Sequence, residues 1–225
     1  MMVNEHLTRQ MDIIPMDVLS TPITVIGAGA IGGWTTLALA KMGFKYLEVF
    51  DFDKVDTVNM NSQFYRFTDI GQSKVTALAS LVHDFTGTKI VGWDQRWDGE
   101  TRDGIVIAAV DNMEIRKRIW EAHAGKCFNT KAIIDPRMGA ESALLFNMDP
   151  LNPKDLKEYP ATLYTDGEAV HERCTAKATM YTAQLLSGLV CKAIKDRLTT
   201  PHYLRVVQWD IGANQALLWP NKPAS

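Results

Sequence analysis

The sequence of 225 residues contains few cysteines and no long hydrophobic run. Its three cysteines are an odd number without a Cys-x-x-Cys pair, which argues against a disulfide framework and against a structural zinc site. No apolar stretch reaches the roughly 18–20 residues that span a bilayer. Residues 1–15 also lack the continuous apolar core of a secretory signal. We therefore expect a cytoplasmic protein that binds neither zinc nor a membrane.

The chain also lacks an excess of charge of either sign. Lys and Arg together number 24, and Asp and Glu number 26, so the formal net charge is -2. This balance gives no electrostatic footprint for nucleic acid or for an anionic membrane surface. Hydrophobic residues make up 46% of the chain, which is enough to bury a core.

Buried-strand patterns alternate with helical patterns from residue 23 onward. Predicted strands cover residues 23–26, 46–50, 89–92, 104–110, 132–135 and 142–148, and two late strands lie between residues 203 and 219. Predicted helices cover residues 30–42, 74–85, 113–124 and 175–197. This alternation predicts an α/β fold, with a doubly wound, mostly parallel, Rossmann-like sheet and late antiparallel strands.

We expect residues 1–225 to form a single domain with two special segments. Residues 1–20 are expected to form an N-terminal arm. Residues 149–174 are rich in proline and charge, and we expect them to form a flexible crossover loop before the last long helix.

A glycine-rich turn joins the first predicted strand to the first predicted helix. Gly27, Gly29 and Gly32 fit the pattern G-x-G-x-x-G. The first glycine permits a sharp turn, the second lets backbone amides approach a phosphate, and the third lets helix and strand pack closely. Asp51 ends the next strand, where its carboxylate can accept hydrogen bonds from ribose hydroxyls. The turn predicts a nucleotide site, but proteins that use NAD, FAD or ATP share it.

Several short motifs together resemble one family. They are Asp51-Phe52-Asp53, Asn59, Gln63, Gly71-Gln72-Ser73-Lys74 and Asp111-Asn112. In this combination the chain resembles the ThiF/MoeB/HesA superfamily, the bacterial relatives of ubiquitin-activating enzymes, from about residue 9 to 111 and more weakly beyond. The resemblance implies an adenylyltransferase that converts ATP to AMP and pyrophosphate with Mg²⁺. Its substrate would be the C-terminal carboxylate of a ubiquitin-like or sulfur-carrier protein, or of a peptide.

The resemblance also implies roles for the matching positions. Lys74 would contact phosphates as a point charge, and Asn59 and Gln63 would belong to the same nucleotide-binding set. Asp111 would hold Mg²⁺ through oxygen at the carboxyl end of a strand. Read from the residues alone, Lys74 could instead be a solvated lysine, and Asp111 could cap the next helix.

Two further features bear on the resemblance to this family. Arg9-Gln10 resembles an element whose arginine reaches into the partner's ATP site, which implies a homodimer, although Arg9 could also be a solvated residue. Ser62 stands where the family usually has an arginine, and Arg66 in the same loop is a candidate replacement. Because the zinc cysteines of many members are absent, the chain resembles a short, zinc-free variant.

Cys174 lies between the predicted crossover loop and the helix predicted to begin at Thr175. Relatives place in this region the thiol that captures the activated carboxylate. A neighbouring Arg173 and a helix N-terminus would favour the thiolate. The alternative is an incidental thiol at a helix start, because some members adenylate without a cysteine step.

The leading interpretation is therefore an adenylyltransferase that uses ATP and Mg²⁺. Its expected catalytic residues are Arg9, Lys74, Asp111 and Cys174. Two other functions remain open at this point. An NAD-dependent oxidoreductase would share the glycine turn, and a non-catalytic nucleotide-binding subunit of a heterodimeric activating enzyme would explain Ser62.

Overall fold

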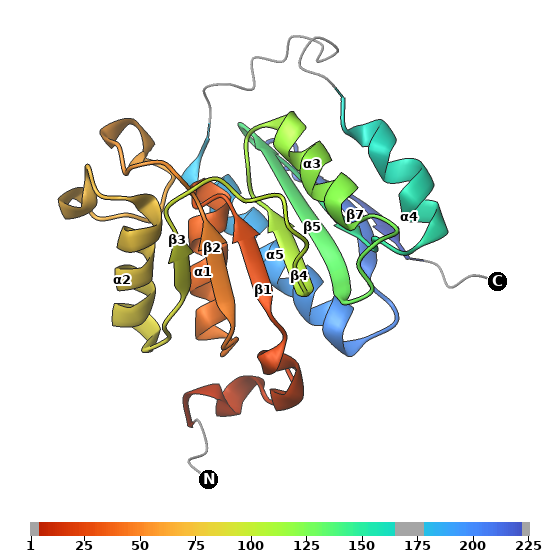
Figure 1. Ribbon diagram of the computed structural model, residues 1–225, viewed down its shortest axis with the longest axis horizontal. Helices are drawn as coiled ribbons and strands as arrows, with labels where there is room; N and C mark the ends of the chain where they lie inside the picture. The colour runs from red at the N-terminus through yellow and green to blue at the C-terminus, as the bar shows by residue number, and fades with distance from the viewer. Residues whose placement is uncertain (1–4, 165–177, 222–225) are drawn as a thin grey trace.

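The computed structural model describes residues 5–164 and 178–221. Among these residues, eight strands form one sheet in the order β3-β2-β1-β4-β5-β6-β7-β8 (Figure 1). Their bounds are Ile23–Ile26 (β1), Leu47–Phe50 (β2), Val91–Trp93 (β3), Gly104–Ala108 (β4), Thr130–Gly139 (β5), Ser142–Met148 (β6), Leu204–Asp210 (β7) and Gln215–Pro220 (β8). Strands β1 to β5 pair in parallel, and β5 to β8 pair antiparallel. The predicted fold class is confirmed.

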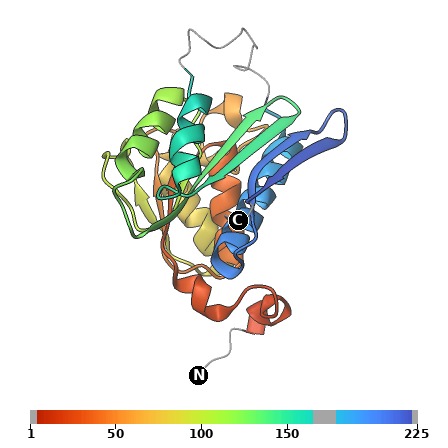
Figure 2. The same cartoon turned by 90° about the vertical axis from the view of Figure 1, so that its right-hand side faces the viewer.

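Helices cover both faces of this sheet (Figures 1 and 2). On one face, α1 (Ala30–Lys41), α2 (Lys74–Thr86) and α5 (Met180–Thr199) enclose the larger hydrophobic core. On the other face, α3 (Met113–His123) and α4 (Pro153–Glu158) enclose a smaller core around Trp120 and Tyr159. None of the helices in residues 5–164 and 178–221 is long and apolar enough to cross a membrane.

The strand order reverses between β1 and β4. The chain runs from β1 outward through β2 to β3, and then returns to the other side of β1 to form β4. In open sheets of this kind, ligands bind outside the carboxyl ends of the strands at the reversal point. The glycine-rich turn follows β1 directly, so it lies at this position.

The N-terminal arm lies at the amino ends of the strands, on the opposite side of the sheet from the glycine-rich turn. It contains two short 3-10 helices, η1 (Glu5–Gln10) and η2 (Met16–Ser20), which lie below β1 in Figure 1. Leu7 and Leu19 of these helices are buried against Gly43, just beyond the end of α1. The Gln10 Nε2 group donates a hydrogen bond of 2.6 Å to the carbonyl of Met42. The arm therefore stays at the end of α1 that is remote from the glycine turn.

The last long helix begins later than predicted. It starts at Met180, with Thr179 as N-cap residue, rather than at Thr175. Ala178 forms a β-bridge with Ala140, and the Thr179 and Thr182 hydroxyls both donate to the Ala140 carbonyl. These contacts hold the backbone extended up to the N-cap, which no helical periodicity in the sequence reveals.

The prediction of one flexible loop over residues 149–174 is wrong for the part that the structure describes. Residues 153–158 form α4, and a 3-10 helix, η5 (Tyr159–Thr162), follows. The Asn152 side chain accepts a hydrogen bond of 2.9 Å from the Lys154 amide, and proline occupies the first helical turn. Asparagine followed by proline is a helix-start signal. Tyr159, at the start of η5, is buried in the smaller core.

Candidate functional site

The glycine turn has a backbone shape that demands two of its three glycines. Gly27 has φ +100, and a Cβ there would lie 2.3 Å from the Ala109 carbonyl oxygen. A Cβ on Gly32 would lie 1.9 Å from the carbonyl oxygen of Gly27. Both glycines lie in close contact with Ala109, directly after β4. A side chain at either position would push β1 and α1 away from the end of β4.

Gly29 differs from the other two glycines. No atom lies within 4 Å of the position that its Cβ would take, so the space above it is open. Gly29 is also the N-cap residue of α1, and no side chain caps this helix. The first amide groups of a helix have no partner within the helix and attract anions. The turn therefore presents open space and unpaired amides at the reversal point of the sheet.

Asp51 connects this turn to the next loop. Its Oδ2 accepts a hydrogen bond of 2.6 Å from the Ala28 amide, and its Oδ1 accepts one of 2.8 Å from the Asp53 amide. The sequence predicts contact with ribose hydroxyls. The structure shows that the nearly buried carboxylate also holds the turn in place. Each oxygen retains a lone pair for a further donor.

Lys74 begins α2 and is only 5% exposed, so the interpretation as a solvated lysine is wrong. Its Nζ lies 2.9 Å from Asp53 Oδ2, and its backbone amide donates to the Asp53 carbonyl at 2.9 Å. Asp53 thus links Lys74 to Asp51. A continuous chain of hydrogen bonds runs from the glycine turn to the lysine.

Lys74 and Asn59 border one cavity of about 560 Å³. The cavity is lined by Asp53, Lys54, Val55, Asp56, Asn59, Ile70, Gly71 and Lys74. The structure therefore brings together two residues that the resemblance assigned to phosphate binding. Asp53, to which no role was assigned from the sequence, lines the same cavity and pairs with Lys74.

Gln63 and Tyr65 lie further along the loop that contains Asn59, outside the lining of this cavity. The Gln63 side-chain oxygen is buried and, within the described residues, has no hydrogen-bond partner, so it could accept one from a ligand. The Tyr65 hydroxyl donates to the Ala28 carbonyl at 2.6 Å. Burial and the negative charge of Asp51 raise the pKa of Tyr65, which therefore remains a donor at neutral pH. Tyr65 had no distinguishing sequence signal.

Asp111 is exposed in the turn between β4 and α3. Two residues earlier, Ala109 lies against Gly27 and Gly32, which places Asp111 next to the glycine turn. Asn112 is the cap of α3, since its side chain accepts a hydrogen bond of 3.1 Å from the Ile115 amide. The interpretation of Asp111 as the helix cap is therefore wrong, and its carboxylate is exposed to solvent.

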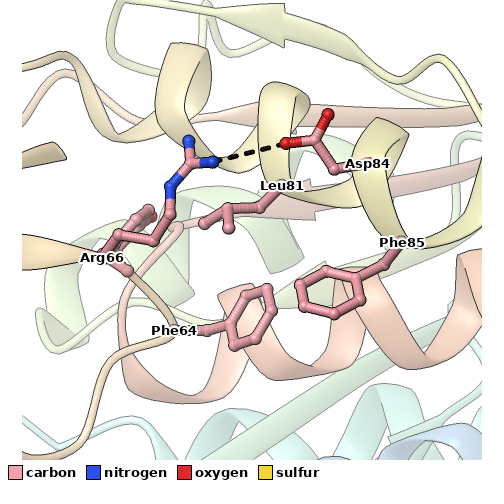
Figure 3. A pocket seen from close by; sticks show the side chains of 6 residues that line it. Phe64, Arg66, Leu81, Asp84 and Phe85 are labelled. Carbon is pink, nitrogen blue, oxygen red and sulfur yellow. Dashed lines mark hydrogen bonds and ion pairs between the residues drawn. The ribbon is translucent and has the colours of Figure 1, made fainter. Parts of the chain in front are cut away.

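Arg66 is not directed toward the cavity that contains Lys74. Its guanidinium pairs with Asp69 at 3.0 Å. It also pairs with Asp84 at 3.3 Å (Figure 3). It borders a separate, mostly apolar pocket of about 260 Å³ against α2. Ser62 is buried, and its carbonyl accepts a hydrogen bond of 3.2 Å from the Trp34 indole. Arg66 is thus paired with two carboxylates and does not line the cavity that contains Lys74.

Among the predicted catalytic residues, Arg9 does not lie at this site within the described chain. Arg9 is exposed in the N-terminal arm, which lies at the amino ends of the strands, whereas the glycine turn lies at their carboxyl ends. Cys174 lies outside the described residues. The premise that its helix begins at Thr175 is wrong, because α5 begins at Met180. The described chain resumes at Ala178, whose carbonyl accepts a hydrogen bond of 3.4 Å from the Asn61 side chain.

The sequence model of the ThiF family matches residues 16–194. The chain belongs to the ThiF family. Ubiquitin-like modifier-activating enzyme 5 of Drosophila persimilis is 32% identical over an alignment of 126 residues, which covers 48% of this chain and 33% of that protein. The NEDD8-activating enzyme E1 catalytic subunit of Dictyostelium discoideum is 35% identical over an alignment of 104 residues, which covers 43% of this chain and 24% of that protein. This ThiF-family chain thus matches only a quarter to a third of the length of these relatives.

Two solved structures share the fold. The crystal structure of E. coli MccB with ATP aligns with a TM-score of 0.74 and 11% identity, covering 96% of this chain and 71% of MccB. The structure of PaaA aligns with a TM-score of 0.70 and 15% identity, covering 95% of this chain and 72% of PaaA. The ThiF-family fold therefore extends over nearly the whole chain.

Proposed function

We propose that this ThiF-family protein is an ATP-dependent adenylyltransferase that activates the C-terminal carboxylate of a protein or peptide. The hydrogen-bonded path from the glycine turn through Asp51 and Asp53 to Lys74 carries the proposal. It joins unpaired helix amides, which suit phosphates, to a buried lysine beside an open cavity. The names of the relatives, activating enzymes for ubiquitin-like modifiers and NEDD8, support the same reaction class.

The proposed reaction brings two anions together. A carboxylate oxygen attacks the α-phosphorus of ATP, the bond to the β,γ-diphosphate breaks, and an acyl adenylate and pyrophosphate result. Lys74 offsets the negative charge of the phosphates, and the first amides of α1 bind their oxygens. Asn59 and Gln63 add polar contacts from the neighbouring loop.

A magnesium ion fits the residues that border this site. Within residues 5–164 and 178–221, no group of three or more His, Cys, Asp or Glu side chains could hold a metal ion. Mg²⁺ usually binds one or two carboxylates together with water and substrate phosphates. Asp111, an exposed carboxylate beside the glycine turn, would be such a ligand. When bound, the ion would neutralise charge on the phosphates.

The partner would be a ubiquitin-like or sulfur-carrier protein, or a peptide, with a free carboxyl end. MccB, which shares the fold, has been crystallised with ATP and with MccA. Arg9 lies at the amino ends of the strands, and the proposed ATP site of its own chain lies at their carboxyl ends. We therefore assign Arg9 to the site of a second copy in a homodimer. We further propose that the Cys174 thiolate attacks the carbonyl carbon of the acyl adenylate, which forms a thioester, breaks the bond to the phosphate and releases AMP. We also propose that the enzyme acts in the cytoplasm.

Pyrophosphate exchange tests the proposed reaction. Synthetic peptides ending in Gly-Gly, with either a free or an amidated C-terminus, are incubated with the protein, ATP, Mg²⁺ and labelled pyrophosphate. We expect label to enter ATP only with the free carboxylates, and Asp111→Ala to abolish the exchange. Tight binding of NAD with no binding of ATP in calorimetry would refute the proposal.

A further inference from the structure

A buried cluster of charged and polar side chains joins α3, β5 and η5. We define it as Arg116, Asp135, Arg137 and Tyr159. Asp135 is 0% exposed, Tyr159 1% and Arg116 6%. No motif in the sequence drew attention to these four residues, which belong to three different elements, α3, β5 and η5. Buried charges are costly unless they are paired, so such a cluster calls for an explanation.

Arg116 reaches from the first turn of α3 back to the segment that precedes Asp111. One terminal nitrogen donates to the carbonyl of Ala108 at 3.0 Å, and the other donates to the carbonyl of Val110. The first nitrogen also contacts the Pro136 carbonyl at 3.1 Å and the Asp135 carboxylate. A single guanidinium thus joins the turn after β4 to strand β5.

The other members of the cluster hold this guanidinium in place. The Asp135 carboxylate pairs with Arg116 on one oxygen and accepts from Arg137 at 2.7 Å on the other. The Tyr159 hydroxyl donates to the same second oxygen at 2.8 Å. Burial and the charge of Arg137 lower the pKa of Arg116 to about 10, so the side chain remains protonated at neutral pH.

Asp111 is therefore placed between two restrained neighbours. Before it, Arg116 binds the carbonyl of Val110; after it, the Asn112 side chain caps α3. Asp111 is also close enough to Arg116 that its carboxylate partly counteracts the lowered pKa of the arginine. An exposed carboxylate with both flanking peptide groups fixed loses little freedom when it binds a cation.

We propose that Arg116 is a positioning residue, which orients Asp111 toward a magnesium ion by binding the Ala108 and Val110 carbonyls from behind. This inference rests on the proposed function, because it assumes that Asp111 is the magnesium ligand. Arg116 itself touches neither nucleotide nor metal in this account. Its effect is exerted through the backbone of the turn.

Arg116→Lys tests the proposal while retaining the charge opposite Asp135. A lysine places all its donors on one nitrogen, so it lacks the second nitrogen with which Arg116 binds the Val110 carbonyl while the first binds Ala108 and Asp135. Arg137→Lys is the matched control, because Arg137 shares Asp135 but contacts Thr162 instead of the turn. For each variant, calorimetry measures ATP binding at a series of Mg²⁺ concentrations and without Mg²⁺, and thermal unfolding checks the fold.

We expect ATP affinity to increase with Mg²⁺ concentration and then to level off. The Mg²⁺ concentration at which half of this increase is reached should be about tenfold higher in Arg116→Lys than in the wild type. Binding of ATP without Mg²⁺ should stay within twofold of the wild type, as should all values for Arg137→Lys. In an Asp111→Asn background, Arg116→Lys should add less than a twofold effect, because two residues in one pathway are not additive.

An unchanged Mg²⁺ dependence in Arg116→Lys would overturn the proposal, as would an equal loss of ATP binding with and without Mg²⁺. If Arg116→Lys does not fold, Arg116→Gln is measured in the same way, because its amide still donates to a carbonyl. Unfolding of both variants would show that Arg116 serves the whole fold, which also overturns the proposal. If the wild type binds ATP without any effect of Mg²⁺, the proposed function itself fails.

Discussion

Gly29 and Gly32 offer a matched pair of substitutions within one turn. Both would receive the same methyl group, but the structure places the two groups differently. At Gly32 the new Cβ would lie 1.9 Å from the Gly27 carbonyl oxygen, a backbone atom that cannot move alone. At Gly29 the new Cβ would meet no atom within 4 Å. The first substitution should therefore affect stability, and the second should affect ligand binding.

The magnitudes follow from these surroundings. Overpacking of this kind costs roughly 1–3 kcal/mol or more, and in a chain of this size each kcal/mol lowers Tm by about 2–4 °C. Gly32→Ala should thus melt several degrees below the wild type. Gly29→Ala should melt close to the wild type, because the gain of about 0.4–1 kcal/mol from a less flexible unfolded chain is offset by the poorer N-cap that alanine makes at this position.

ATP binding should show the opposite order. If phosphates lie against the N-terminus of α1, a methyl group on Gly29 occupies the space above the helix amides, and ATP affinity should fall about tenfold or more, which is about 1.4 kcal/mol. Differential scanning calorimetry and titration calorimetry measure the two effects. Unchanged ATP affinity in Gly29→Ala would refute the phosphate site, and unchanged stability in Gly32→Ala would refute the packing argument.

Two further predictions concern single side chains. Lys74→Met removes the partner of Asp53 and should lower the rate of pyrophosphate exchange about 10²-fold. Lys45 is an exposed lysine near the N-terminal arm, and Lys45→Gln should leave this rate unchanged. Equal exchange rates in the two variants would contradict the role of Lys74. Burial lowers the pKa of His123, whose Nε2 accepts a hydrogen bond of 3.0 Å from the Arg102 amide, below its ordinary value of 6.5. As pH falls below about 6.5, protons bind the unfolded state first and stability declines. Urea unfolding at pH 7.5 and 5.5 should show this decline, and it should be smaller in His123→Gln.

Local signals in the sequence were sufficient for most elements. The run of β-branched residues before Gly27 and the helical spacing after it predict β1 and α1 closely, because both depend on neighbours in the chain. The last two strands were likewise predicted around Gly212. The start of α5 was not, because its extended approach depends on the contact of Ala178 with Ala140, 38 residues earlier.

The sequence by itself determined the class of the fold, the glycine turn and the resemblance to the ThiF family, since these depend on short patterns of residue type and spacing. Only the tertiary structure showed that Lys74 is buried against Asp53 and that Arg66 faces α2 instead. It alone revealed that Arg116 supports the turn before Asp111. The physical reason is that burial and pairing of a charge depend on which distant segments meet, and one-dimensional spacing carries little information about such meetings.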